Sequence, residues 1–207
     1  MTRIITFSEF FGKIAKLSAV IELDSNTSGD ETGSGEAARA TYGTQLFRGT
    51  VTLQASDLAS ADSFSAKLAL LKSADCVFEF TPLQAIDRQT IIDAIEGIGD
   101  DRRDIYLQDT ANVLGAIGAQ EGAYFSVSYA SGKRSLHQVA LDRGTVSAPP
   151  FSGRHLVAVP PAPFSVLAGD TVVLGNPVVR AILDTATPHT FTTNLGSGAT
   201  FNWVQTF

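Results

Sequence analysis

The chain has 207 residues, of which 44% are hydrophobic and 17% are charged, and its net charge is −6. This length suits one large or two small domains. A charged fraction below the usual ~25% fits a Gly-rich β protein and equally a surface partly covered by neighbouring molecules. No stripe of Lys and Arg is present to neutralise phosphates, which argues against nucleic-acid binding.

The N-terminus does not resemble a signal peptide, and no stretch reaches the ~18 apolar residues that span a membrane. We therefore expect no membrane insertion and a protein that stays in the cytosol or leaves it only within a particle. The single cysteine, Cys76, excludes an internal disulfide. It precedes Val77 and Phe78 in an apolar strand, so we interpret it as a buried structural thiol.

The first predicted strand covers residues 13–23. Its core candidates are Ile14, Val20, Ile21 and Leu23. The polar segment 24–36 follows and is rich in Ser, Thr and Gly, which is typical of a long loop or the tip of a hairpin. Its length suggests that this segment is functional or mobile.

A strand, a helix and a second strand are the clearest elements. Residues 47–54 alternate between apolar and polar side chains, which predicts a half-buried strand. Asp57 can cap a helix over residues 58–74, in which apolar residues recur at helical spacing. A return strand is predicted over residues 76–81, and Pro82 ends it.

Residues 84–120 have the weakest pattern. We predict a short helix over residues 89–96, broken by Gly97 and Gly99, and a solvated turn over residues 100–104. The whole segment is interpreted as an insertion that reaches toward another subunit.

The rest of the chain is predicted to be β. Strands are expected at residues 123–129, 135–141, 172–174, 178–183 and 190–193, and a proline-rich connection lies between residues 149 and 163. The final strand places Phe201, Trp203, Gln205 and Phe207 on one face. The predicted fold is mainly β (α+β): a β-sandwich or split barrel with one flanking helix in residues 1–110, and a second small β-rich lobe in residues 111–207.

No motif for catalysis is present. The sequence lacks the Gly-x-x-x-x-Gly-Lys-Ser/Thr phosphate loop and the Gly-x-Ser-x-Gly nucleophile elbow. The three histidines, His137, His155 and His189, lack the close spacing of zinc ligands and are interpreted as surface or edge-strand residues. The carboxylates between Asp93 and Asp109 are interspersed with Arg and Gly, which favours a solvated loop over a metal or acid–base site.

One segment partly matches a calcium loop. Asp24, Asn26 and Ser28 stand at alternate positions with Gly29 sixth, but the carboxylate of Glu36 comes one residue too late. We keep these four oxygen donors as a weak calcium candidate and interpret the segment as a flexible polar loop. We predict no cofactor and no resident metal.

The elements collected above resemble the distal tail (Dit-like) or minor tail proteins of siphophages and of phage-derived gene transfer agents. The resemblance rests on residues 46–54, on the helix 57–74 and its return strand, and on residues 166–174 with the strands that follow. Together these cover about half of the chain. Residues 84–120 have no counterpart in that family, and the common Pro-Pro-Leu-Arg-like ending is absent.

The resemblance implies a structural protein of the virion, not an enzyme, that is assembled into a tail in the bacterial cytoplasm. It would form a ring, hexameric in that family, between the tail tube protein and the baseplate hub protein, with DNA only passing through the lumen. Free sheet edges and hairpins can supply the contacts between copies by strand addition. Our interface candidates are Asp24, Glu36, Arg102, Arg103, Trp203 and Phe207.

Three alternatives stay open. The chain could be another tail component, such as a tube or terminator subunit. It could instead be a carbohydrate- or surface-binding β module with Trp203, Tyr124 and Tyr129 as stacking platforms, although packing in the core is the favoured interpretation of these aromatics. A hydrolase with an unrecognised site is the third.

Overall fold

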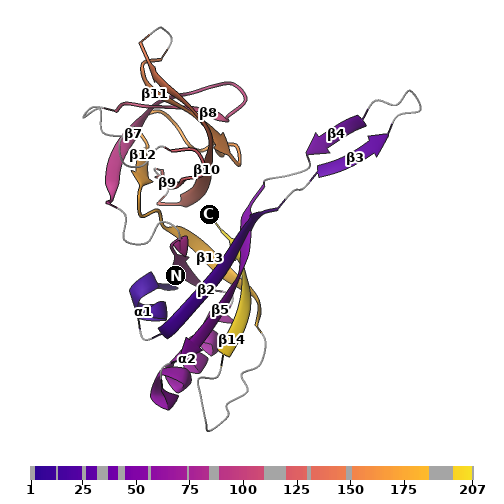
Figure 1. The fold of residues 1–207 in the computed structure, drawn as a ribbon, viewed down its shortest axis with the longest axis vertical. Coiled ribbons are helices and arrows are strands. Elements are labelled where there is room, and N and C mark those ends of the chain that lie inside the picture. Colours follow the sequence, from indigo (N-terminus) through magenta and orange to yellow (C-terminus); the bar gives the residue numbers. More distant parts are fainter. Residues whose placement is uncertain are drawn as a thin grey trace.

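The computed structural model describes most of the chain. The described residues are 3–12, 14–24, 27–31, 37–41, 45–55, 57–73, 75–83, 89–109, 120–129, 132–147, 151–186 and 198–206. They form a six-stranded sheet with two helices, a closed six-stranded barrel and a projecting two-stranded hairpin (Figure 1). The predicted mainly β fold with a flanking helix is confirmed.

The six-stranded sheet joins the beginning of the chain to its end. Its strands in spatial order are β1 (Arg3–Ile5), β6 (Cys76–Phe80), β13 (Val179–Ala186), β14 (Gly198–Gln205), β5 (Phe47–Ala55) and β2 (Ile14–Leu23). Neighbouring strands are antiparallel except β1, which runs parallel to β6. The predicted strands 47–54, 76–81 and 178–183 and the last strand are therefore confirmed, whereas residues 190–193 lie outside the described part.

Two helices begin at side-chain caps. Helix α1 (Phe7–Phe11) begins at a capping box, because the Thr6 hydroxyl accepts from the Glu9 N–H and the Glu9 carboxylate accepts from the Thr6 N–H. Helix α2 (Leu58–Leu71) begins as predicted at Asp57, whose carboxylate accepts from the Ser60 N–H at 2.7 Å. It ends at Leu71, before the predicted limit at residue 74.

Aromatic packing holds the helices on the sheet. Phe10 of α1 contacts Phe78 and Phe201 of the sheet at centroid distances of 5.3 and 5.8 Å, and Phe64 of α2 at 5.1 Å. Cys76 is buried on the same strand as Phe78, as predicted, and its burial raises the pKa of the thiol. The side chains that face the helices are thus the ones that the strand alternation had assigned to the core.

Strand β2 corrects one part of that assignment. Leu17, Ala19 and Ile21 pack against the core, whereas Val20 lies on the other face of the sheet and is 64% exposed. The expectation that Val20 and Ile21 are both core residues was wrong, because consecutive side chains of a strand point to opposite faces.

A hairpin extends the β2–β5 pair away from the body of the molecule. Strands β3 (Thr27–Glu31) and β4 (Ala37–Thr41) pair from Thr27 with Thr41 to Glu31 with Ala37. Figure 1 shows this hairpin, here called the arm, standing clear of both the sheet and the barrel. Residues 27–31 are therefore the first strand of a hairpin, which was one of the two structures predicted for residues 24–36.

The barrel is closed. Its strands in spatial order are β10 (Arg134–Val146), β11 (Gly153–Val159), β8 (Asp104–Leu107), β7 (Ile91–Ile98), β12 (Thr171–Leu174) and β9 (Tyr124–Ser128), which returns to β10. The predicted helix at residues 89–96 was wrong, since Ile91–Ile98 is a strand paired with β8 and β12. Residues 91–98 and 104–107 are thus strands of the barrel wall, and a contact of this segment with another subunit stays a prediction.

The two bodies alternate along the sequence. Barrel strands lie on both sides of residue 110, and the sheet receives its last two strands from the C-terminal part of the chain. Sheet membership thus does not follow a division at residue 110. After β6 the chain passes from the sheet into the barrel, and after β12 it returns to the sheet through Asn176 and Val178. The barrel is therefore connected to the sheet at both its first and its last strand.

Candidate assembly surface

The barrel is fixed to the sheet by polar bonds and by apolar contacts, among them Tyr124 of β9 on Phe47 of β5 at a centroid distance of 5.8 Å. Arg134 of the barrel donates from Nη1 to Glu79 Oε1 at 3.2 Å, and Arg180 of the sheet donates from Nη1 to the Gly132 carbonyl at 2.9 Å. Leu136 on the outside of the barrel is fully buried in the core of the sheet. These contacts make the sheet and the barrel one platform from which the arm projects.

The strands of the arm pair with each other and, among the described strands, with no other strand. At its base, Asp24 donates its N–H to the Leu46 carbonyl at 2.9 Å, and the Asp24 carboxylate pairs with Arg48. Beyond this point β3 and β4 bond to each other in a separate two-stranded sheet. Because an isolated two-stranded hairpin is marginally stable in water, an arm of this kind is stabilised when a neighbouring molecule covers it.

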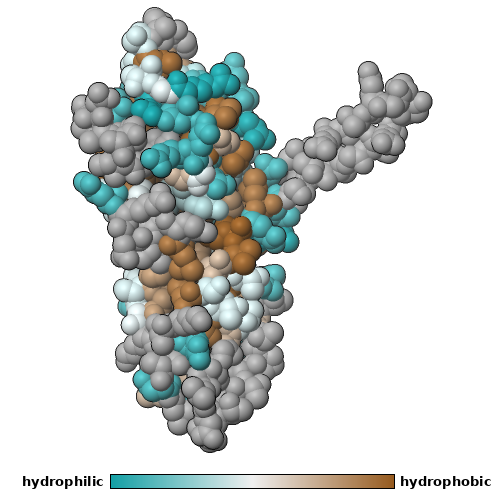
Figure 2. Space-filling model, viewed as in Figure 1, coloured by the Kyte–Doolittle hydropathy of each residue, from teal (hydrophilic) through white to brown (hydrophobic). Residues whose placement is uncertain are grey.

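The sheet has a long exposed edge at β2. This ten-residue strand pairs with β5 on one side, and no described strand pairs with its other side. Leu17, Ile21 and Leu23 are only partly buried although they face the core. In Figure 2 apolar surface gathers over the middle of the molecule, where β2 and α1 lie in Figure 1, while the barrel surface is mostly polar. An edge strand of this length is suited to accept a strand from another molecule.

The outer face of the sheet, opposite the helices, carries an apolar row. The strand registers place Ile4 beside Val77, and Ile182 beside Val204. The same registers place Val77 next to Ile182, one residue beyond the pair of Ala181 and Phe78. Ile4 is 39% exposed and Ile182 is 40% exposed. The row thus crosses four neighbouring strands, with Val77 nearly buried at 8% exposure between the exposed Ile4 and Ile182.

The predicted interface residues are in different environments. Asp24 lies at the base of the arm, whereas Glu36 and Phe207 lie outside the described residues. Trp203 is 1% exposed and packs on Phe80 at 4.9 Å, so it belongs to the core of the sheet and not to its surface.

Arg102 organises a loop at the end of the barrel. It has a positive φ of 61°, and its guanidinium donates to the carbonyls of Ala162, Pro163 and Val166. The predicted turn is present, with Asp100 and Asp101 exposed, but residues 102–104 are partly buried and not fully solvated. The neighbouring Arg103 is half-buried and stays an interface prediction.

The loop that Arg102 holds presents two apolar side chains to solvent. Phe164 is 88% exposed, with the Arg102 guanidinium 5.5 Å from its ring centroid, and Leu167 is 61% exposed. Val166 between them is fully buried and closes the barrel core. Nothing in the sequence pattern indicated this tip, because its conformation depends on bonds between distant segments.

The weak calcium candidate is not assembled in the described residues. Ser28 lies in the extended strand β3, and Asp24 is engaged with Arg48. Asn26 and Glu36 lie outside the described part of the chain. Where residues are described, no group of three His, Cys, Asp or Glu side chains could hold a metal ion.

Two of the histidines are buried, which corrects their interpretation as surface residues. His137 is fully buried inside the barrel, where its ring nitrogens lie 2.8 Å from Ser135 Oγ and 2.9 Å from the Pro160 carbonyl oxygen. Burial lowers the pKa of His137 from 6.5 to about 4. His155 bonds to Asp104 Oδ1 at 2.7 Å. His189 lies outside the described residues, and the interpretation of Trp203 and Tyr129 as core aromatics is confirmed.

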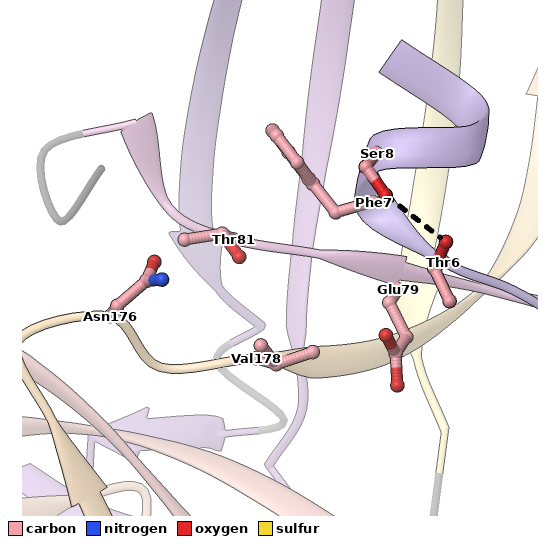
Figure 3. A pocket seen from close by; sticks show the side chains of 7 residues that line it. All are labelled: Thr6, Phe7, Ser8, Glu79, Thr81, Asn176 and Val178. Atoms are coloured by element: carbon pink, nitrogen blue, oxygen red, sulfur yellow. Dashed lines mark hydrogen bonds between the residues drawn. The ribbon is translucent and has the colours of Figure 1, made fainter. Parts of the chain in front are cut away.

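A pocket of about 320 Å³ lies beside the end of β6, near the junction with the barrel. Figure 3 shows its lining, which comes from the start of α1 (Thr6, Phe7 and Ser8), from β6 and its end, and from the connection between barrel and sheet. The pocket exists because β1 pairs with β6 only as far as Ile5 and Phe78. Beyond that register the chain turns into α1 at Thr6 and leaves β6 uncovered.

A scan against protein-family models gives no match for this chain, and neither does a search of curated proteins. In the part of the chain that is described, no helix has the length and apolar character needed to cross a membrane.

Proposed function

We propose that this protein is a structural subunit that assembles with its own copies into a ring in a phage-like tail, between the tube and the baseplate hub. The observation that carries the proposal is the arm, which extends β2 and β5 beyond the body of the molecule. A hairpin whose strands, among those described, pair only with each other gains stability from contact with the next subunit. Tail tube and hub proteins are the further partners, and DNA passes through the lumen without being bound.

The surfaces of the sheet support heterologous contacts, in which two different faces of identical subunits meet. The free edge of β2 offers backbone groups for strand addition. The row from Ile4 to Val204 offers an apolar patch on the outer face. When such contacts are related by a rotation that closes, they produce a ring.

Shortening the arm tests the proposal. Asp24 and Leu46 are bonded at its base, so residues 25–45 can be replaced by Asn-Gly, which favours a tight hairpin turn. Full-length and shortened proteins are compared by light scattering and negative-stain electron microscopy across a concentration series.

We expect closed rings with a central hole from the full-length chain and dissociated subunits from the shortened one, with unchanged circular dichroism from the sheet and barrel. A full-length chain that stays monomeric up to its solubility limit would contradict self-assembly. Rings of unchanged stability without the arm would show that the arm is not the contact.

A further inference from the structure

The pocket beside the end of β6 is a feature that assembly does not explain. The geometry points to a site for one residue of a neutral saccharide in this pocket, with Phe7 as its apolar wall. This inference does not rest on the proposed ring, because the lining belongs to a single chain.

The size of the pocket suits one sugar ring. Its volume of about 320 Å³ lies at the lower end of the range of about 300–1,000 Å³ that is usual for small-molecule sites. It also lies where two bodies of one chain meet, which is a common place for such sites.

The charges around the pocket favour a neutral ligand. Glu79 is the charged residue of the lining, and its Oε1 is already paired with Arg134 at 3.2 Å. The ion pair leaves little net charge to attract either a cation or an anion.

The polar groups of the pocket can both donate and accept hydrogen bonds. Thr81 and Ser8 contribute hydroxyls, and Asn176 contributes a side-chain amide that Figure 3 shows on the connection from the barrel. No side-chain hydrogen bond is found for Thr81 or Asn176 among the described residues, and Thr81 is only 4% exposed. Sugar hydroxyls likewise both donate and accept, so they match this set of groups.

Phe7 supplies the apolar part of the site. Its ring is held from one side by Phe11 at 4.8 Å and by Phe80 at 6.4 Å, yet it remains partly exposed and lines the pocket. A ring whose orientation is fixed by packing presents an apolar surface to the C–H face of a pyranose at little entropic cost. The pocket thus offers an apolar wall and a rim of neutral polar groups.

Binding can be measured on the full chain by ¹H–¹⁵N NMR titration with glucose, galactose, rhamnose and N-acetylglucosamine, and with acetate as an anionic comparison. We expect saturable shifts at Phe7, Thr81 and Asn176 with at least one sugar and none with acetate. A purified bacterial cell-wall polysaccharide, titrated in parallel, distinguishes a polymeric glycan from a free monosaccharide as the preferred source of the same chemistry.

Two variants test the assigned groups. Asn176→Ala removes an exposed amide and Thr81→Val removes a hydroxyl at constant shape, and each is expected to weaken sugar binding by about three- to tenfold. Thr52→Val, a matched change on the outer face of the sheet, should leave binding unchanged. The inference is overturned if no sugar gives saturable shifts in the folded protein, or if both pocket variants bind as the unaltered chain does. Ring formation is measured separately, so each proposal can fail alone.

Discussion

The barrel and the six-stranded sheet of this protein differ in how their edge strands are treated. In the barrel every described strand has two neighbours, and inward residues such as Ile95, Leu107 and Leu156 are fully buried. The six-stranded sheet ends at β2, whose outer edge no described strand covers, and continues into an arm. Closure makes the barrel complete within one chain, whereas the sheet has surfaces that another molecule can complete.

The difference concerns surface and not core. The sheet has a core as well buried as that of the barrel, with Phe78, Phe80 and Val51 inaccessible to solvent. The parts of the sheet that another molecule could cover are the edge of β2 and the outer face, where the apolar side chains of Val20 and Ile182 are exposed. Changes in the two cores should therefore affect folding, and changes at the edge should affect association.

The largest loss in the free energy of unfolding is expected for a substitution in the core of the sheet. Phe78→Ala removes a fully buried ring that contacts Phe10, Phe11 and Phe201. We expect a loss of about 3–5 kcal/mol in the free energy of unfolding, measured by urea denaturation with Trp203 fluorescence as the reporter of the sheet. A loss below about 1 kcal/mol would mean that the aromatic cluster can close around the gap.

Acid should weaken the barrel through His137. Its pKa in the folded protein is about 4, below the ordinary 6.5. As the pH falls below 6.5 the unfolded chain takes up the proton first, so stability is lost between pH 6.5 and 4 and the loss is complete below that range. The full loss is about 3 kcal/mol, and it should appear in hydrogen exchange of β9, β10 and β11.

Carboxylates with lowered pKa values also lose stabilising charge in acid, so His137 must be isolated by a variant. At Asp142 burial alone would raise the pKa, but hydrogen bonds from Arg154 and from the Gly144 N–H lower it. His137→Gln keeps a polar side chain without the titration. It should remove the part of the pH dependence between pH 6.5 and 4, and an unchanged profile would contradict the assignment.

Local patterns predicted the sheet better than the barrel. Strands β5 and β14 and the helix cap at Asp57 were predicted correctly. Each depends on residues that are near neighbours in the sequence. The sequence predicts a helix at β7 because its isoleucines fit the period of a helix as well as that of a strand. Only the pairing of β7 with β8 and β12 decides between helix and strand.

The surfaces were harder to predict than the elements. Arg102 holds carbonyls about 60 residues later in the chain, and the pocket combines three separate segments. Such contacts follow from the topology and not from local spacing. Trp203 was proposed at an interface because it is aromatic and near the end of the chain, but its place in a central strand buries it.

A smaller loss in the free energy of unfolding is expected for a substitution of Gly97 on the outside of the barrel. A Cβ added there would lie 2.1 Å from Cδ1 of Phe151, whose ring packs on Tyr106 at 4.8 Å. Gly97→Ala should therefore cost about 1–3 kcal/mol through forced displacement of the Phe151 ring. In a double-mutant cycle measured by urea unfolding, Phe151→Ala should relieve most of this cost. Additive losses would show that the backbone at Gly97, and not the ring, is the constraint.

The smallest effect on folding, and the most informative, is expected at Val20. Val20→Lys places a charge on an exposed position of the edge strand, so stability should change by less than about 0.5 kcal/mol. A lysine on an edge strand opposes strand addition by another molecule, so the concentration needed for self-association should rise.

Sedimentation velocity of the Val20→Lys protein, beside Ile92→Lys as a matched control, separates the edge from general surface charge. Ile92 is 70% exposed on the barrel wall, where β7 already has two neighbours and no edge is available. If both lysines weaken association equally, net charge and not the edge of β2 controls it. If only Val20→Lys acts, the open sheet carries assembly and the closed barrel does not, because two exposed aliphatic residues of similar size then differ only in the strand that bears them.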